Sequence, residues 1–318
     1  MIGAEIELIV PPDSSGARLD RFVAGATGVS RSELQRWIES GRVTVEGAAR
    51  GAGTRLQRGQ RIVVRPDGPA RTEAKPDPVV RIDVMYVDAD IVVVAKPAGL
   101  VVHPSLGHAT GTLVNGLLAL GLFRSEDLSD PADSASHSRP GIVHRLDKGT
   151  SGVMVVARTP EAREALKAQF QAHSIERAYE AIAVGEASEG TIATLHARHP
   201  RQRLRFTGRT TRGKPAVTHV RALARLRGTT HVSCTLETGR THQIRMHLAE
   251  SGTPVLGDPL YGGSIADPEL RAISERLGHQ ALHARLLGFV HPRSGSQLRF
   301  ESKLPDDFLA ALDALRGG

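Results

Sequence analysis

The spacing of apolar residues along the chain predicts more strands than helices. Alternating or continuous apolar runs predict strands at IVVVAK, VMVVAR, YEAIAVG, AVTHVRALARL and HVSCTLE. Thr159, Pro160 and Glu161 form a typical helix start, which predicts a helix to about His173, and HQIRMHLAES predicts another. Because strands and helices do not alternate regularly, we predict an α+β fold built on a mixed, largely antiparallel β-sheet.

The N-terminal part of the chain carries its own short pattern. Apolar residues at helical spacing from Leu19 predict a helix that Gly25 and Gly28 would end, and RSELQRWIES predicts a second helix. RVTVEG and QRIVVRP are short alternating stretches that predict strands. We therefore expect a small α/β domain here, with Trp37 in its core rather than stacked on a base.

A length of 318 residues accommodates one large and one small domain. The stretch PDGPARTEAKPDP is rich in Pro and charge, as is typical of a linker. We predict a small domain over residues 1–66, a linker over 67–78 and a larger domain over 79–318.

Positive charge is concentrated in two parts of the chain. The formal net charge is +7 and the isoelectric point is near 10.0. Residues 16–65 hold ten arginines and four acidic residues, and residues 191–230 hold nine arginines and one lysine but no acidic residue. Either block alone is compatible with an ordinary solvated surface. Together they favour two contact areas on a polyanion such as RNA.

Several kinds of site are not supported by the sequence. Cys234 is the single cysteine, so neither an intramolecular disulfide nor a cysteine-based zinc site is expected, and its strand-like surroundings place it in the core. His242 and His247 lack partners at metal-ligand spacing, so we predict no metal. Neither a glycine-rich phosphate loop nor a dinucleotide-binding motif is present, so we predict no cofactor.

The N-terminal stretch MIGAEIELIVPPDSS has neither the basic nor the apolar region of a signal peptide. No apolar run approaches the roughly 18 residues that suggest a membrane span. We expect a cytoplasmic protein without a membrane partner.

One segment places a single acid among basic residues. In GIVHRLDKGTSG, Asp147 is flanked by His144, Arg145 and Lys148. Cationic neighbours favour an ionised carboxylate, which a nucleophile or an electrostatic stabiliser requires. A structural ion pair needs the same surroundings, so the pattern alone leaves both interpretations open.

HRLDKGTSG resembles the catalytic motif of the RluA-type pseudouridine synthases. Further matches lie at KPAGLVVHP, GTLVNGLL, ERAYEAIAVG, GKPAVTH, LETGRTHQIRMHL, GDPLYGG and QALHARLLGFVHP. Their order and number are most similar to the RluD-type branch, which acts on large-subunit ribosomal RNA. The segment around SRSELQRWIESGRVTVEG resembles an S4-like RNA-binding domain.

The resemblance implies a mechanism and a set of site residues. A catalytic aspartate would attack a flipped uridine, either at the anomeric carbon or at the base ring. A tyrosine would pack against the uracil, and an arginine would pair with the aspartate. By position these catalytic residues are Asp147, Tyr179 and Arg245, and the substrate-binding residues are Arg145, His144 and Arg240.

The resemblance also implies that the chain acts as a monomer, without an external cofactor, on large-subunit ribosomal RNA or a pre-ribosomal subunit. Gly149 departs from the pattern, since the family commonly has an acidic residue there. Two other functions remain possible at this point: a noncatalytic ribosome-assembly factor that only binds RNA, and a nucleobase glycosylase that would release free uracil.

Overall fold

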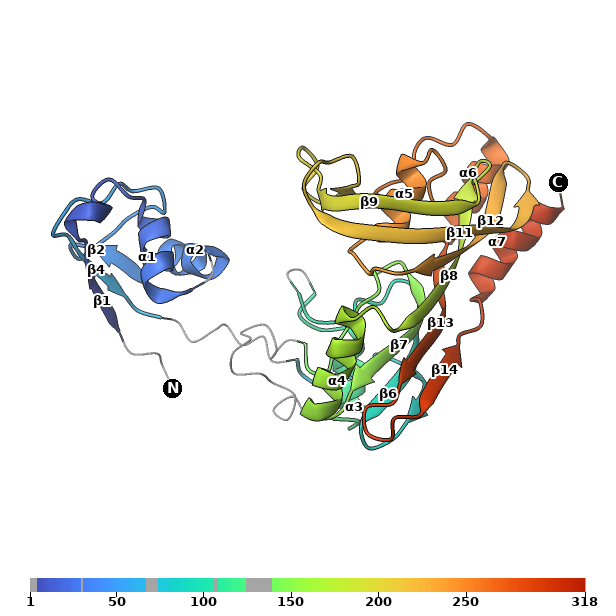
Figure 1. Cartoon of the computed structure of the whole chain (residues 1–318), viewed down its shortest axis with the longest axis horizontal. Helices are drawn as coiled ribbons and strands as arrows, with labels where there is room; N and C mark the ends of the chain where they lie inside the picture. The colour runs from blue at the N-terminus through green and yellow to red at the C-terminus, as the bar shows by residue number, and fades with distance from the viewer. Residues whose placement is uncertain (1–4, 30, 67–73, 106–107, 124–138, 318) are drawn as a thin grey trace. The chain divides into compact units, whose positions relative to one another are not determined.

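The computed structural model describes residues 5–29, 31–66, 74–105, 108–123 and 139–317 (Figure 1). The chain divides into two compact units, residues 1–71 and 72–318. Part of the segment predicted as a linker, residues 67–73, lies outside the described residues. The remainder packs on the second unit, because Asn115 donates its side-chain amide to the carbonyl of Lys75 at 2.7 Å. Among the described helices, none is both long and apolar enough to cross a membrane.

The first unit is a four-stranded antiparallel sheet packed against two helices. Its strand order is β1-β4-β2-β3. The bounds are β1 Ile6–Ile9, α1 Leu19–Thr27, α2 Arg31–Glu39, β2 Val43–Val45, β3 Ala48–Ala49 and β4 Arg61–Val64. Gly25 lies inside α1, and only Gly28, with φ of 70°, ends the helix, so the prediction that Gly25 is a breaker was wrong. Trp37 is buried in the core of this unit, as predicted.

The second unit is built on a ten-stranded sheet within the described residues. Its order is β10-β9-β11-β12-β8-β13-β7-β6-β5, and β14 pairs with β13. Every pairing is antiparallel except β13 with β7, which confirms a mixed, largely antiparallel α+β fold. The strands are β5 Asp83–Val87, β6 Ile91–Lys96, β7 Ser151–Ala157, β8 Glu176–Val184, β9 Gly190–Arg198, β10 Phe206–Thr207, β11 Lys214–Leu226, β12 Thr229–Leu236, β13 Leu282–Val290 and β14 Gln297–Glu301.

Helices cover both ends of this sheet (Figure 1). The helices are α3 Leu113–Ala119, α4 Pro160–Gln171, α5 Gln243–Glu250, α6 Pro268–Leu277 and α7 Asp306–Arg316. Near β6, Val92 and Val94 pack in one cluster with α3, and Ile91 and Val93 pack in another with α4. Burial on both faces explains why β6 reads as a continuous apolar run.

The end of the sheet that carries β8 and β12 packs against α5, α6 and α7. Cys234 lies in this core with no exposed surface, as predicted. Burial raises the pKa of its thiol to about 12, so the thiol stays protonated at neutral pH. At the other end of the sheet, α4 begins with Thr159 as its N-cap, whose hydroxyl accepts the backbone N–H of Ala162.

Gly152 is required where β7 meets β13. Its φ is 117°, a conformation that residues with a Cβ rarely adopt, and a Cβ there would overlap the backbone of Ala284. The glycine thus allows the parallel pairing of His283 with Ser151. Because Asp147 lies just before β7, this pairing also fixes the position of the loop that carries it.

We expect Gly152→Ala to lower the free energy of unfolding of the second unit by about 3 kcal/mol or more, through backbone strain and overpacking. Chemical denaturation measures this loss. Gly190→Ala is the matched control, because Gly190 has a φ of 138° but open space around the added Cβ. Equal losses in the two variants would show that close packing at Gly152 is not the cause.

Candidate active site

A buried lysine holds the loop that precedes β7. Lys96, at the end of β6, donates to the carbonyls of Pro97 and Leu100 at 2.9 Å each and to the carbonyl of Lys148 at 3.3 Å. The Lys96 side chain is 1% exposed. Because Lys148 follows Asp147, this contact ties the carboxylate-bearing loop to the sheet.

Asp147 is paired with a buried arginine that has a second acid behind it. Arg245 Nη1 on α5 donates to Asp147 Oδ2 at 2.8 Å, and Nε and Nη2 donate to the two oxygens of Asp258 at 2.7 and 2.8 Å. Burial by itself would raise the pKa of Asp258. Its bonds from Arg245 and from the backbone N–H groups of Tyr261 and Leu260 outweigh burial and lower that pKa.

Arg245 stays protonated in this arrangement. Burial lowers the pKa of the guanidinium, but the bonds and charges of Asp258 and Asp147 outweigh burial and leave that pKa above its ordinary value. A bidentate pair with Asp258 fixes the guanidinium plane. Arg245 therefore presents an N–H of Nη1 to Asp147 in a fixed direction.

Tyr179 and His144 border the same space from β8 and from the loop. Burial raises the pKa of Tyr179, so its phenol is neutral at neutral pH. His144 accepts the backbone N–H of Val155 at Nε2 and stacks on Phe170 at 4.6 Å. Burial and, to a smaller extent, Arg177 lower the pKa of His144 to about 3, so its ring is neutral too.

A cavity of about 340 Å³ lies between these elements. Arg145 is an exposed residue at its edge, and Arg240 donates Nε to the carbonyl of Pro215 at 3.1 Å. The cavity is lined by all six residues predicted for the site, namely His144, Arg145, Asp147, Tyr179, Arg240 and Arg245. Among the described residues that line it, Asp147 is the single acid and faces four arginines.

A family comparison matches this part of the chain directly. The RNA pseudouridylate synthase family matches residues 90–250, which include every residue that lines the cavity except Leu282. The S4 domain family matches residues 17–62 in the first unit. The chain belongs to the RNA pseudouridine synthase family.

Known relatives cover nearly the whole of this pseudouridine synthase. It is 43% identical to a protein of Pseudomonas aeruginosa named ribosomal large subunit pseudouridine synthase D, over 96% of this chain and 94% of that protein. It is 40% identical to an uncharacterized RNA pseudouridine synthase of Bacillus subtilis, over 98% of each chain. The solved structure of human RNA pseudouridylate synthase domain containing 1 is 25% identical, with a TM-score of 0.54 over 76% of this chain and 90% of that chain.

Sequence reasoning missed one arginine of this synthase. Arg177 lies two residues before Tyr179 on β8, is 6% exposed and lines the cavity. It donates Nη2 to the carbonyl of Glu237 at 3.0 Å, whereas its buried Nε has no hydrogen-bond partner. Burial lowers the pKa of Arg177. An under-satisfied buried cation at a cavity wall suits a site that receives an anionic substrate.

The functions of other residues near the cavity were also not assigned from the sequence. Asp258 and Tyr261 lie in GDPLYGG and Lys96 in KPAGLVVHP, which were used only as signs of family membership. Their contacts join segments far apart in the chain, so spacing alone does not reveal them. His242 was considered only as a metal ligand, although it lies 3.7 Å from Asp147.

Gly149, where the sequence departs from the family pattern, lies against the side chain of Gln280 in the structure. A Cβ at this position would overlap the side-chain amide of Gln280, which donates to the hydroxyl of Thr150 at 3.0 Å. An acidic residue at position 149 would therefore require Gln280 to move. With glycine at this position, the buried Gln280 side chain packs directly against the loop.

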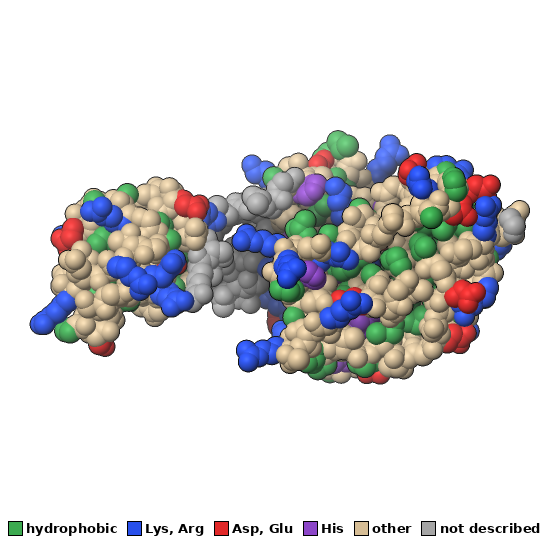
Figure 2. Space-filling view, turned by 90° about the horizontal axis from the view of Figure 1, so that it is seen from above, with side chains coloured by type: hydrophobic (Ala, Val, Ile, Leu, Met, Phe, Trp, Pro, Cys, Tyr) green, Lys and Arg blue, Asp and Glu red, His purple; other side chains and the backbone are tan. Residues whose placement is uncertain are grey.

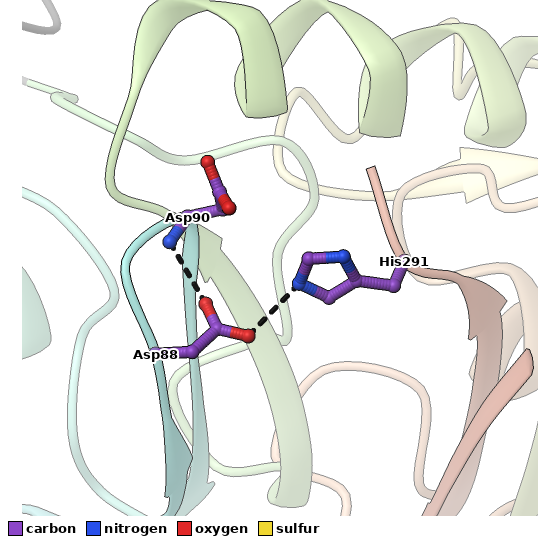
Figure 3. Close-up of side chains that lie close together, drawn as sticks. All are labelled: Asp88, Asp90 and His291. Atoms are coloured by element: carbon purple, nitrogen blue, oxygen red, sulfur yellow. Dashed lines mark hydrogen bonds and ion pairs between the residues drawn. The ribbon is translucent and has the colours of Figure 1, made fainter. Parts of the chain in front are cut away.

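In the described part of the chain, Asp88, Asp90 and His291 lie close enough together to hold a metal ion (Figure 3). His291 Nδ1 accepts a backbone N–H from Arg293 at 3.2 Å, so Nε2 carries the proton and donates to Asp88 at 2.8 Å. Both oxygens of Asp90 accept from the Arg293 side chain at 2.6 Å. Since these groups satisfy one another, we assign the cluster a structural role that joins β13 to the turn before β6.

Exposed arginines gather on residues 198–214, from the end of β9 to the start of β11, which we call the basic arm. Lys and Arg side chains are visible on the surfaces of both units (Figure 2). Two side chains of the arm lie over aromatic rings, with Arg198 4.9 Å from Phe206 and Arg205 4.8 Å from Tyr261. Stacking on rings fixes these guanidinium groups while their charge remains available to a polyanion.

Lys96 predicts a pH-dependent contribution to stability. Burial lowers the pKa of Lys96 to about 7, against the opposing charge of Asp147. Since the folded-state pKa lies below that of the unfolded chain, the wild type should gain stability from this group as the pH rises from about 7 to about 10.

Lys96→Met removes that titration. The free energy of unfolding of the wild type minus that of the variant should therefore be greater at about pH 9 than at about pH 6. Chemical denaturation at the two pH values measures it. Lys303→Met, at an exposed position, is the control and should show no such change. A difference independent of pH would contradict the buried titration of Lys96.

Proposed function

We propose that this chain isomerises specific uridines of large-subunit ribosomal RNA to pseudouridine, with Asp147 as the nucleophile and the target uridine flipped into the cavity. The single observation that carries this proposal is the pairing of Asp147 with Arg245 inside a cavity lined by four arginines and Tyr179. The relatives named large subunit pseudouridine synthase D support the choice of RNA.

The cavity is suited to hold a flipped nucleotide. Extrusion of a base from folded RNA costs a few kcal/mol, which contacts in the pocket must offset. Tyr179 offers a neutral ring for the uracil to pack against. We propose that Arg145, which is exposed and lines the cavity, occupies the vacated position or holds the nucleotide. Arg177 and Arg240 supply further positive charge for the backbone phosphates.

The proposed reaction needs no atoms from outside the substrate except exchangeable protons. An Asp147 oxygen bonds to the anomeric carbon or to the base ring, and the bond between the sugar and N1 breaks. After the uracil rotates, its carbon 5 bonds to the anomeric carbon, and the bond to Asp147 breaks, which returns the free carboxylate. The proton on carbon 5 leaves to solvent while N1 gains one. The product is an isomer of the substrate, so no oxidant, reductant or cofactor enters the balance.

The two units would contribute differently to RNA binding. We propose that residues 1–66 act as the RNA-binding domain and residues 79–318 as the catalytic domain, with 67–78 as the linker. The S4 domain match and the arginine-rich composition of the first unit support this division. The six site residues come from one chain, so we propose that a monomer is sufficient for activity.

Site-resolved pseudouridine mapping of ribosomal RNA tests the proposal in cells. Cells that lack this protein would be rescued with the wild type or with Asp147→Ala. We expect one or more pseudouridines of the large-subunit RNA to disappear in the deletion and to return only with the wild type, because the variant lacks the nucleophile.

Other results would change the assignment in defined ways. An unchanged large-subunit RNA would contradict the substrate and direct the search to other RNAs. Return of the modification with Asp147→Ala would contradict the nucleophile. Free uracil as product would identify a glycosylase, and full rescue of growth by the variant would favour an RNA-binding assembly factor.

A further inference from the structure

The two oxygens of Asp147 have different surroundings. Oδ2 accepts the hydrogen bond from Arg245 at 2.8 Å. Oδ1 faces Nε2 of His242 at 3.7 Å, beyond hydrogen-bond distance. Both His242 and Asp147 side chains are 18% exposed, so this contact is largely shielded from water. Oδ1 is thus the oxygen with the weaker interaction, and His242 is the group beside it.

The backbone and two aromatic neighbours fix the His242 ring. His242 has φ of 58° and ψ of 19°, the left-handed conformation, directly before α5. A non-glycine residue held there is uncommon and often occurs at functional sites. Phe206 and Tyr261 each approach the ring edge-on, with centroids 5.6 Å away. These contacts leave the ring little freedom to turn away from Asp147.

Hydrogen bonds on the far side of the ring indicate which nitrogen carries the proton. The Tyr261 hydroxyl oxygen accepts the backbone N–H of Phe206 at 2.7 Å and lies 3.2 Å from His242 Nδ1. Its own proton can therefore go to Nδ1, which leaves the ring proton on Nε2. Burial lowers the pKa of His242, which favours this neutral form even though the charge of Asp147 opposes the shift. An Nε2–H group facing a carboxylate is also favoured over a lone pair in that position.

We propose that Tyr261 holds His242 in the Nε2–H tautomer, so that His242 positions Asp147 and directs its Oδ1 atom at the substrate. This inference rests on the proposed role of Asp147 as the nucleophile. Arg245 fixes one oxygen, and the His242 N–H limits rotation of the carboxylate around the other. Reaction geometry is sensitive to displacements of about 1 Å, so loss of this restraint should slow the chemical step more than it weakens RNA binding.

The same contacts link the carboxylate to the basic arm. Phe206 lies in β10 within the arm, and Arg198 and His196 pack on its ring at 4.9 and 4.6 Å. Hydrogen bonds run from the Phe206 N–H through the Tyr261 hydroxyl to His242, whose Nε2 lies 3.7 Å from Asp147. Phe206 therefore belongs both to the basic arm and to the set of contacts that positions Asp147.

A double-mutant cycle tests the proposal. Large-subunit RNA labelled with tritium at carbon 5 of uridine, prepared from cells that lack this protein, reports turnover by tritium release. We expect His242→Phe to lower kcat by about 10²-fold with KM changed by less than about threefold, and Tyr261→Phe to lower kcat by about 10-fold. His242→Gln, which can place an amide N–H near the Nε2 position, should recover much of the loss. The double variant should be no slower than His242→Phe alone.

Controls separate positioning from loss of folding. Tyr86→Phe removes a hydroxyl that bonds Asp88 at 2.8 Å, far from this path, and should leave kcat unchanged. Each variant is compared per folded molecule, with circular dichroism as the check. Losses that multiply in the double variant, or that appear in KM rather than kcat, would overturn the proposal.

Nitrogen-15 NMR of the histidine rings gives a test that does not depend on turnover. In the wild type we expect His242 to show a protonated Nε2 and an unprotonated Nδ1 at neutral pH, and Tyr261→Phe should introduce the other tautomer. An Nδ1–H tautomer in the wild type would overturn the proposal even if the enzyme is fully active. If the wild type shows the expected tautomer but Asp147→Ala remains active, the role of Asp147 as nucleophile is wrong, whereas the tautomer assignment stands.

Discussion

Asp147→Asn should lower kcat for tritium release by about 10³-fold or more while the protein stays folded and binds RNA. The amide cannot act as a nucleophile, yet it has nearly the shape of the carboxylate and can still accept from Arg245. Arg245 also keeps its bidentate pair with Asp258, so no buried charge is left without a partner. The loss should therefore appear in the chemical step.

Single-turnover tritium release measures the chemical step, and filter binding at several salt concentrations measures RNA affinity. Asp83→Asn, an exposed position on β5, is the matched control for loss of one negative charge. Both variants should bind RNA slightly more tightly than the wild type, because each removes a repulsive charge. Residual activity of Asp147→Asn within about tenfold of the wild type would eliminate Asp147 as the nucleophile.

Arg245→Met should destabilise the second unit by about 3–5 kcal/mol in addition to abolishing turnover. The Asp258 side chain is fully buried, and the substitution removes its charged partner. Two backbone N–H groups would still bond its oxygen, at 2.8 and 2.9 Å, but they do not replace a cation. The double variant Arg245→Met with Asp258→Asn should recover part of the stability, because it removes the uncompensated charge, and none of the activity.

The pH dependence of this destabilisation has a definite sign. In the wild type the pKa of Asp258 is lowered, so its stabilising contribution is present at neutral pH and is lost as the pH falls through the lowered value. In Arg245→Met, we expect burial without the guanidinium to raise that pKa. The difference in free energy of unfolding should therefore be largest near pH 7 and shrink toward about pH 4. A constant difference across this range would show that Asp258 is not the source of the loss.

Sequence patterns predicted elements whose stability is local or whose burial is regular. Thr159 with Pro160 predicted the start of α4, and the apolar run IVVVAK predicted the strand β6. The core positions of Trp37 and Cys234 followed from their patterns and are confirmed. These predictions succeed because capping and alternation act between neighbours in the chain.

The arrangement around Asp147 required the tertiary structure. Arg245 was proposed from family resemblance, but its bidentate bond to Asp258 depends on how the chain folds back after α5. Asp258 lies thirteen residues after Arg245. Burial of Lys96 under Lys148 joins residues 52 positions apart. The left-handed backbone of His242 is equally invisible to helical periodicity, which extends through the residue. No rule of sequence spacing predicts contacts of this kind.

The chromophores of the protein are divided between its two units. Trp37, the single tryptophan, lies in the core of the first unit, whereas the three tyrosines, Tyr86, Tyr179 and Tyr261, lie in the second. Fluorescence excited selectively at tryptophan therefore reports the melting of the first unit alone, without labelling. Combined with circular dichroism of the whole chain, this optical separation shows in one sample whether a substitution in the second unit leaves the first intact.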